Sequence, residues 1–316
     1  MTDDKVITAK DLTRTFGKFT AVDHITFDVK QGEIFGFLGA NGAGKTTAIK
    51  MLTGILSSTS GVAKVAGFDI NTERNELKKN IGYMSQKFSL YEDLTLKENI
   101  KFYGGIYGLG KDEIVRKTGE MIERLGLQNI EDTMIKEVPL GWKQKIAFSV
   151  AILHHPRIVF LDEPTSGVDP ITRRQFWNLI YEAAADGITV FVTTHYMDEA
   201  ELCQRVGFLS EGKLVALDTP DKLKQTQMRG HVLEIACRNS EQAVRILRQA
   251  QTGGKLPFDE IALYGAQIHA VVPDAERYKE PIWTLLTGHG IDVQAIEWIA
   301  PTLEDVFISS VQARGE

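Results

Sequence analysis

The sequence predicts an α/β protein: a mostly parallel sheet with an antiparallel β-subdomain and a helical subdomain, followed by a small α+β C-terminal domain. Three observations indicate this. A short apolar run at residues 33–38 leads through a glycine-rich loop into a segment of helical period. Apolar runs then alternate with helical segments, as in sheets built from parallel strands. Around residues 218–220 the pattern changes, so we expect two domains, 1–224 and 225–316.

The first domain begins with alternating apolar and polar residues at 6–29, around a turn at 16–18, which predicts antiparallel strands. Apolar residues recur at helical spacing in six segments: 46–56, 95–107, 112–125, 143–153, 172–184 and 197–203. Thr95 and Asp112 are suited to cap the second and third of these helices. Further strands are expected at 158–161, 189–193, 206–210 and 213–216. The second domain reads as strand, helix, strand, strand, helix and strand, at 231–236, 240–249, 261–264, 267–272, 276–287 and 292–298. This order is ferredoxin-like.

Composition excludes several classes of protein. The chain has 36 Lys and Arg against 42 Asp and Glu, a formal net charge of -6, so we expect no binding to nucleic acid. Cys203 and Cys237 stand far apart, which predicts reduced thiols rather than a disulfide or a zinc site. The N-terminus is polar and no apolar window approaches the roughly 18 residues of a membrane span. We therefore expect a cytoplasmic protein that reaches a membrane through a partner.

The glycine-rich loop has the composition of a phosphate cradle. It fits the pattern G-x-x-x-x-G-K-[ST], and it comprises Gly39, Ala40, Asn41, Gly42, Ala43, Gly44, Lys45, Thr46 and Thr47. Glycines let backbone N–H groups surround phosphate oxygens, and the helix that follows adds the positive end of its dipole. Lys45 is expected to reach the β- and γ-phosphates of ATP, and the Thr46 hydroxyl to bind Mg²⁺.

Two carboxylates end a buried strand. The apolar run 158–161 is typical of the middle of a parallel sheet, and Asp162 and Glu163 follow it directly. Asp162 is expected to hold Mg²⁺, and Glu163 to orient the attacking water. His195 ends the next predicted strand, where the carboxyl ends of strands meet in one crevice. A single histidine is more often a packed or surface residue, but this placement favours a contact with the γ-phosphate or the water.

Further short motifs follow the loop in a set order. Residues 82–86 read Gly-Tyr-Met-Ser-Gln, 162–165 Asp-Glu-Pro-Thr, 166–169 Ser-Gly-Val-Asp and 194–195 Thr-His. In order and interval they closely resemble the ATP-binding cassette (ABC) family, over residues 12–218 or about two thirds of the chain. The resemblance implies the fold of a P-loop NTPase of the ABC cassette type.

The resemblance also implies roles for single residues. Gln86 would contact Mg²⁺ and meet a transmembrane subunit, and Phe16 would stack on adenine. Asp169 belongs to the family's D-loop and counts with the nucleotide-binding residues, while His195 matches its switch histidine. Taken alone, Phe16 is also suited to packing the β-subdomain, and Gln86 is also suited to being an ordinary loop amide.

One family motif is altered. The signature Leu-Ser-Gly-Gly-Gln corresponds here to residues 138–142, Val-Pro-Leu-Gly-Trp, so only Gly141 survives. Pro139 offers neither a hydroxyl nor an N–H to a phosphate, although a helix beginning near Gly141 still supplies backbone N–H groups. We expect Gly141 to face the nucleotide of a second copy, with altered and slower hydrolysis.

The resemblance is finer in two places. Residues 164–170 and 195–201 are similar to cassettes that serve ABC-2-type exporters, often of drugs, and residues 301–307, Pro-Thr-Leu-Glu-Asp-Val-Phe, are similar to the ends of many of them. Residues 301–307 also read as a short amphipathic helix that packs on the C-terminal domain. We therefore expect an ATP-hydrolysing homodimer that drives an integral membrane permease. The alternatives are a cassette acting on DNA or ribosomes, and a regulatory cassette that binds ATP with weak hydrolysis.

Overall fold

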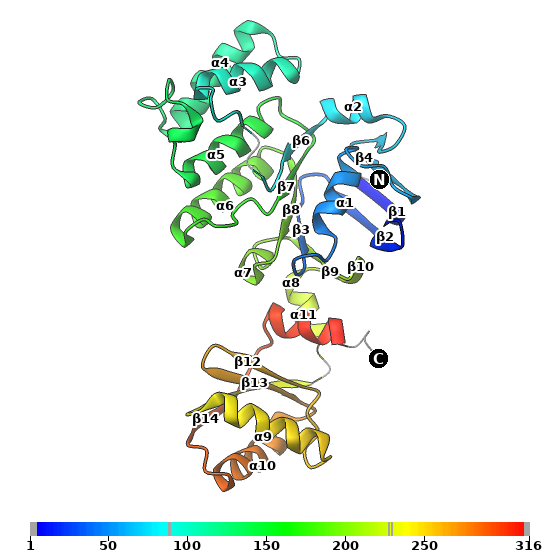
Figure 1. The fold of residues 1–316 in the computed structure, drawn as a ribbon, viewed down its shortest axis with the longest axis vertical. Helices are drawn as coiled ribbons and strands as arrows, with labels where there is room; N and C mark the ends of the chain where they lie inside the picture. Colours follow the sequence, from blue (N-terminus) through cyan, green and yellow to red (C-terminus); the bar gives the residue numbers. More distant parts are fainter. Residues whose placement is uncertain (1–4, 88–89, 227, 229, 313–316) are drawn as a thin grey trace. The chain divides into compact units, whose positions relative to one another are not determined.

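The computed structural model describes residues 5–87, 90–226, 228 and 230–312. Residues 311 and 312 are described by their backbone alone. The chain divides into two compact units, Met1–Thr219 and Pro220–Glu316 (Figure 1). Helix α8 (Pro220–Thr226) opens the second unit, so the predicted limits of 224 and 225 fall within this helix. In the described ranges, none of the helices has the length and apolar character required to cross a bilayer.

The central sheet of the first unit has, among the described residues, six strands in the order β10-β9-β3-β8-β7-β6. They are β3 (Ile34–Leu38), β6 (Ile81–Met84), β7 (Ile158–Asp162), β8 (Thr189–Thr194), β9 (Arg205–Ser210) and β10 (Lys213–Asp218). All neighbours pair in parallel except β10, which is antiparallel to β9. Every residue of β3, β7 and β8 is buried, which explains the apolar runs of β3 and of the first four residues of β7.

A second sheet of the first unit is antiparallel, in the order β2-β1-β4-β5 within the described residues. It contains β1 (Lys5–Phe16), β2 (Phe19–Lys30), β4 (Ser60–Val65) and β5 (Phe68–Asp69). The predicted turn lies at Gly17, with φ +58°. Phe27 of this sheet packs its ring 5.0 Å from that of Phe37 in β3, and Phe35 lies 5.4 Å from Phe191 in β8. These rings join the two sheets in one core.

The helices of the first unit are α1 (Lys45–Leu52), α2 (Arg74–Lys79), α3 (Leu96–Ile106), α4 (Lys111–Leu125), α5 (Leu140–Ala151), α6 (Pro170–Ala185) and α7 (Met197–Ala200), with a 3₁₀ turn at Ile135–Glu137. Thr95 caps α3 in a capping box with Glu98, as its position predicted. Asp112 lies in the first turn of α4 rather than at its cap, which is Gly110. Helix α6 begins two residues earlier than expected because the Asp169 side chain caps it and proline occupies its first position.

The second unit has the β-α-β-β-α-β order that the sequence predicted, followed by a terminal helix (Figure 1). Its elements are β11 (His231–Cys237), α9 (Ser240–Thr252), β12 (Glu260–Tyr264), β13 (Gln267–Val272), α10 (Ala275–Gly288), β14 (Val293–Ile299) and α11 (Leu303–Gln312). The strands form an antiparallel sheet in the order β12-β13-β11-β14. Alternate residues of β13, such as Ile268 and Ala270, join α9 and α10 in one core. His269 points to the other face and contacts Asp305 of α11 at 2.9 Å.

Candidate nucleotide site

The glycine-rich loop connects β3 to α1 in a conformation that its glycines permit. Gly42 and Gly44 have φ of +84° and +104°, values that favour glycine. A Cβ on Gly44 would lie 2.4 Å from the backbone oxygen of Ala21, and one on Gly39 would lie 2.4 Å from that of Leu209. The loop is therefore held against β2 and β9 by contacts that only glycine allows, and α1 begins directly behind it at Lys45.

Asp162 lies at the end of β7, beside the start of α1. Its Oδ1 accepts hydrogen bonds from Thr46 Oγ1 at 3.1 Å and from Thr193 Oγ1 at 2.8 Å. Burial raises the pKa of Asp162, and the two hydroxyl donors oppose this by lowering it. A hydroxyl and a carboxylate held together are oxygen ligands of the kind that Mg²⁺ prefers, so these two residues fit the predicted metal site.

Glu163 is the centre of the site. Its Oε1 lies 3.0 Å from Lys45 Nζ. Its Oε2 accepts a hydrogen bond from Gln86 Nε2 at 3.0 Å and lies 3.4 Å from His195 Nδ1. The Glu163 backbone has φ +49°, and its N–H donates to both oxygens of Thr193 at 3.1 Å, which turns the side chain out of the strand direction. Lys45 at the start of α1, Gln86 after β6 and His195 after β8 thus converge on one buried carboxylate.

A cavity of about 420 Å³ lies over these groups. Its lining consists of Phe19, Ala21, Asn41, Gly42, Gly44, Lys45, Thr46, Thr47, Gln86 and Glu163. Gly39, Ala40 and Ala43 complete the loop behind it, and the carbonyl oxygens of Gly39 and Ala40 accept hydrogen bonds from Lys45 at 2.8 and 3.1 Å. Phe16 is half exposed at the end of β1, with the Arg14 guanidinium 4.5 Å above its ring, and it is not among the residues that line this cavity.

Gly141 and Asp169 are also absent from the lining of that cavity. Gly141 lies in the first turn of α5, where a Cβ would stand 2.5 Å from the Thr172 Cγ2 of α6. Asp169 accepts hydrogen bonds from the N–H groups of Ile171 and Thr172, both at 3.0 Å. Within one chain, both residues therefore serve the packing of α5 and α6.

Comparison with known proteins places the chain in a family. The family model for the ABC transporter domain matches residues 22–166. The linearmycin resistance ATP-binding protein LnrL of Bacillus subtilis is 31% identical over 96% of this chain and 97% of its own length. The chain belongs to the ABC transporter family. The resemblance of the sequence motifs to an ABC cassette is thereby confirmed.

Two further ABC relatives show how far the likeness reaches. The probable multidrug ABC transporter ATP-binding protein YbhF of Escherichia coli is 51% identical over 70% of this chain, but the chain spans only 38% of that protein's length. A solved ATP-binding subunit of an ABC transporter superposes with a TM-score of 0.64 at 27% identity, covering 70% of this chain and 92% of its own. The predicted fold class is confirmed.

Sequence reasoning missed some residues of this ABC site. Phe19 is 63% exposed and lines the cavity, while its neighbour across the β1–β2 turn, Phe16, does not. Both aromatic residues flank the turn, so the turn alone gave no reason to choose one of them. The hydrogen bond from Thr193 to Asp162 was also missed. Its signal was available, because Thr193 pairs with Asp162 in the parallel register of β7 and β8.

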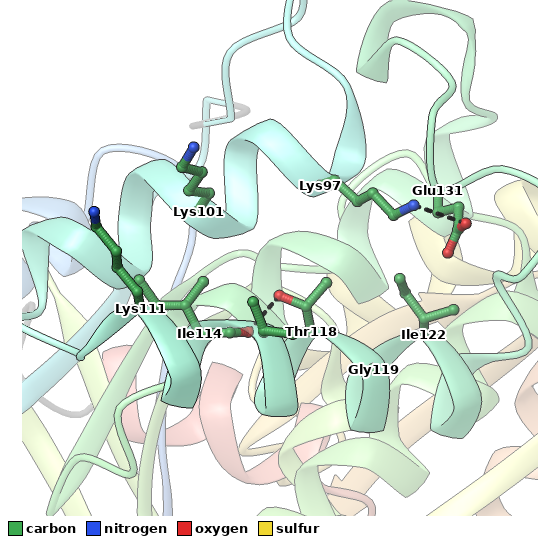
Figure 2. A pocket seen from close by; sticks show the side chains of 9 residues that line it. Lys97, Lys101, Lys111, Ile114, Thr118, Gly119, Ile122 and Glu131 are labelled. Carbon is green, nitrogen blue, oxygen red and sulfur yellow. Dashed lines mark hydrogen bonds and ion pairs between the residues drawn. The ribbon is translucent and has the colours of Figure 1, made fainter.

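A second hollow of this ABC chain, of about 550 Å³, lies between α3 and α4 (Figure 2). Ile114, Val115 and Ile122 form its apolar floor, and Lys101 and Lys111 stand at its rim. A further rim residue, Lys97, points to Glu131 at 2.8 Å, as Figure 2 shows. Val115 is 73% exposed, so part of the apolar lining of this groove lies open at the surface.

Proposed function

We propose that this chain binds Mg-ATP and hydrolyses it, and that two copies complete the site. The observation that carries the proposal is the convergence on Glu163: Lys45, Gln86 and His195 all reach its carboxylate within 3.4 Å. Lys45, Gln86 and Glu163 line the glycine-loop cavity, and His195 contacts Glu163 from outside that lining. Such a cavity suits a triphosphate, because backbone N–H groups and an ammonium face the same space.

Each residue of the site has a proposed role. Lys45 neutralises charge on the β- and γ-phosphates, and His195 donates to the γ-phosphate. Glu163 orients the attacking water and accepts its proton. Thr46, Asp162 and Gln86 hold the Mg²⁺, which when bound draws negative charge from the phosphate oxygens.

The second copy would supply Gly141 and Asp169, as the resemblance to the ABC signature motif implies for Gly141; neither residue lines the cavity of its own chain. Helix α5 begins without a side-chain cap, because Pro139 stands at its N-cap position. Trp142 N–H donates to the Pro139 carbonyl, so the N–H groups of Leu140 and Gly141 are the ones proposed to face a phosphate of the partner's nucleotide. Pro139 removes the hydroxyl of the family signature, so we propose a slower hydrolysis than a complete signature would give.

The membrane partner is proposed to be a permease of the ABC-2 type, in an exporter of drugs. Support comes from the named relatives, which are described as a multidrug transporter protein and a linearmycin resistance protein. The α3–α4 groove is the surface we propose for this contact. Replacing Val115 with Glu should reduce co-purification of the permease while ATP binding stays unchanged, and unchanged co-purification would exclude the groove.

The test of the catalytic proposal is Glu163→Gln in the complex with the permease. We expect turnover to fall by at least about 10²-fold, the usual weight of a general base, while ATP binding is retained. Glu182→Gln is a matched control, because Glu182 is an exposed side chain whose ion-pair partner, within the described part of the chain, is Arg124. Equal turnover in Glu163→Gln and the wild type would refute the assignment. A wild type that binds ATP without turnover would favour the regulatory cassette.

A further inference from the structure

A buried carboxylate outside the site connects two of its loops. Glu199 lies in α7 and is 1% exposed. Its Oε1 accepts a hydrogen bond from Thr165 Oγ1, and its Oε2 accepts one from Thr194 Oγ1 at 2.6 Å. Both threonines are themselves 1% exposed. A buried charge is costly unless it is paired and hydrogen-bonded, so this arrangement requires both hydroxyls.

The two hydroxyl donors are neighbours of the proposed reacting groups. Thr165 lies two residues after Glu163, in a turn closed by hydrogen bonds from Ser166 N to Glu163 O and from Val168 N to Thr165 O. Thr194 directly precedes His195, at the end of β8. The Glu199 carboxylate therefore ties the turn that carries the base to the strand end that carries the histidine.

A third contact fixes Glu199 from the side of α6. Arg173 Nε lies 3.5 Å from Glu199 Oε1, and Arg173 Nη1 donates to Asp198 Oδ2 at 3.2 Å. The Arg173 guanidinium also lies 4.1 Å above the ring of Tyr196. Arg173 lies in the first turn of α6, the helix that Asp169 caps, so the start of α6 is part of the same arrangement.

We propose that Glu199 is a positioning residue that sets the separation of Glu163 and His195. Through Thr165 it restrains the turn behind Glu163, and through Thr194 it restrains the backbone of His195. Loss of either hydrogen bond lets the 3.4 Å contact between these two side chains widen. Misplacement by about 1 Å is enough to lower a rate by roughly 10²-fold. This inference rests on the proposed function of the site.

The experiment compares Glu199→Gln and Thr194→Val with Thr194→Ser and Glu182→Gln in the full chain with its permease. Thr194→Ser keeps the hydroxyl, and Glu182→Gln alters an exposed carboxylate of α6 that has no part in the arrangement around Glu199. We expect kcat to fall about 10- to 100-fold in the first two variants, with ATP affinity within about twofold of the wild type. The two controls should keep kcat within about twofold.

A second measurement does not depend on hydrolysis. The imidazole NMR signals of His195, assigned by their absence in His195→Gln, should move in Glu199→Gln and Thr194→Val and stay in place in both controls. The inference fails if these signals stay in place, if kcat is unchanged, or if ATP affinity falls in proportion to kcat. If the wild type shows no turnover, the proposed hydrolysis fails, and the NMR comparison alone then decides whether Glu199 positions His195.

Discussion

Glu260 makes the stability of the second unit depend on pH. It opens β12, is 7% exposed, and its Oε2 has no hydrogen-bond partner among the described residues. Burial, and secondly the negative charge of Asp305, raise the pKa of Glu260 from 4.5 to about 7. Since the folded chain then holds a proton that the unfolded chain has released, the stability of the folded sheet falls as pH rises from about 4.5 through about 7.

The size of this effect follows from the gap between the two pKa values. At about 1.4 kcal/mol per pKa unit, the gap from 4.5 to about 7 corresponds to about 3 kcal/mol of unfolding free energy. Roughly 2.5 kcal/mol of this is lost between about pH 5 and about pH 8. Glu260→Gln removes the ionisation, so the variant should lose less stability than the wild type across this range.

Hydrogen exchange of the β13 amides in the full chain measures this local stability. The wild type should lose roughly 50- to 100-fold in protection, corrected for intrinsic rates, beyond what Glu260→Gln loses between about pH 5 and about pH 8. His269 contributes in the same direction. Burial lowers its pKa, but Asp305 and Glu234 raise it overall, so its contribution is present below about 6.5 and lost as pH rises through the folded value.

Because His269 titrates in both proteins, only the difference between them reports on Glu260. Glu297→Gln, an exposed position on β14, is the matched control and should behave as the wild type. Equal slopes of protection against pH in the wild type and Glu260→Gln would refute the reasoning.

Three further substitutions test the glycines and the cap around the site. Gly44→Ala should abolish ATP binding in a titration with fluorescent nucleotide, because its φ is +104° and its Cβ would stand 2.4 Å from the Ala21 oxygen; retained affinity would contradict the tight contact. Gly141→Ala should cost about 1–3 kcal/mol in denaturant unfolding, and adding Thr172→Ser should restore much of it by removing the methyl group in its way. Asp169→Ala should lose about 1 kcal/mol of stability as the α6 cap is removed, which unchanged unfolding would disprove.

The central sheet and the phosphate loop were predictable because their residue types leave few alternatives. The continuous apolar run of β7 indicates a strand buried on both faces, and the glycines of the loop indicate the turn between β3 and α1. Strands β4, β5 and β6 and helices α2 and α8 were missed; β5 has only two residues and β6 four, and the two helices have six and seven. Periodicity carries little information over such lengths.

The structure brings together Lys45, Gln86, Glu163 and His195, all named from the sequence, but the connections behind them were not predicted. Lys45, Asp162 and Glu163 follow from the chemistry of phosphate and metal binding. The hydrogen bonds of Glu199 with Thr165 and Thr194 join positions up to 34 residues apart, and no local pattern indicates them. Phe19 lines the cavity and Phe16 does not, a difference that the turn residues around Gly17 alone do not specify. The adenine contact of Phe16 stays a prediction.

The parallel register of the central sheet sets the level at which each residue of the nucleotide site leaves the sheet. Leu38 pairs with Thr194, and Asp162 with Thr193, so the glycine loop, the acidic pair and the histidine all leave the sheet within one or two residues of the same level. An insertion of a single residue in β7 would advance its carboxylates by about 3.3 Å and turn them to the opposite face. Insertions or deletions in β3, β7 or β8 would therefore misplace the residues of the nucleotide site, whereas those in loops away from the site would not.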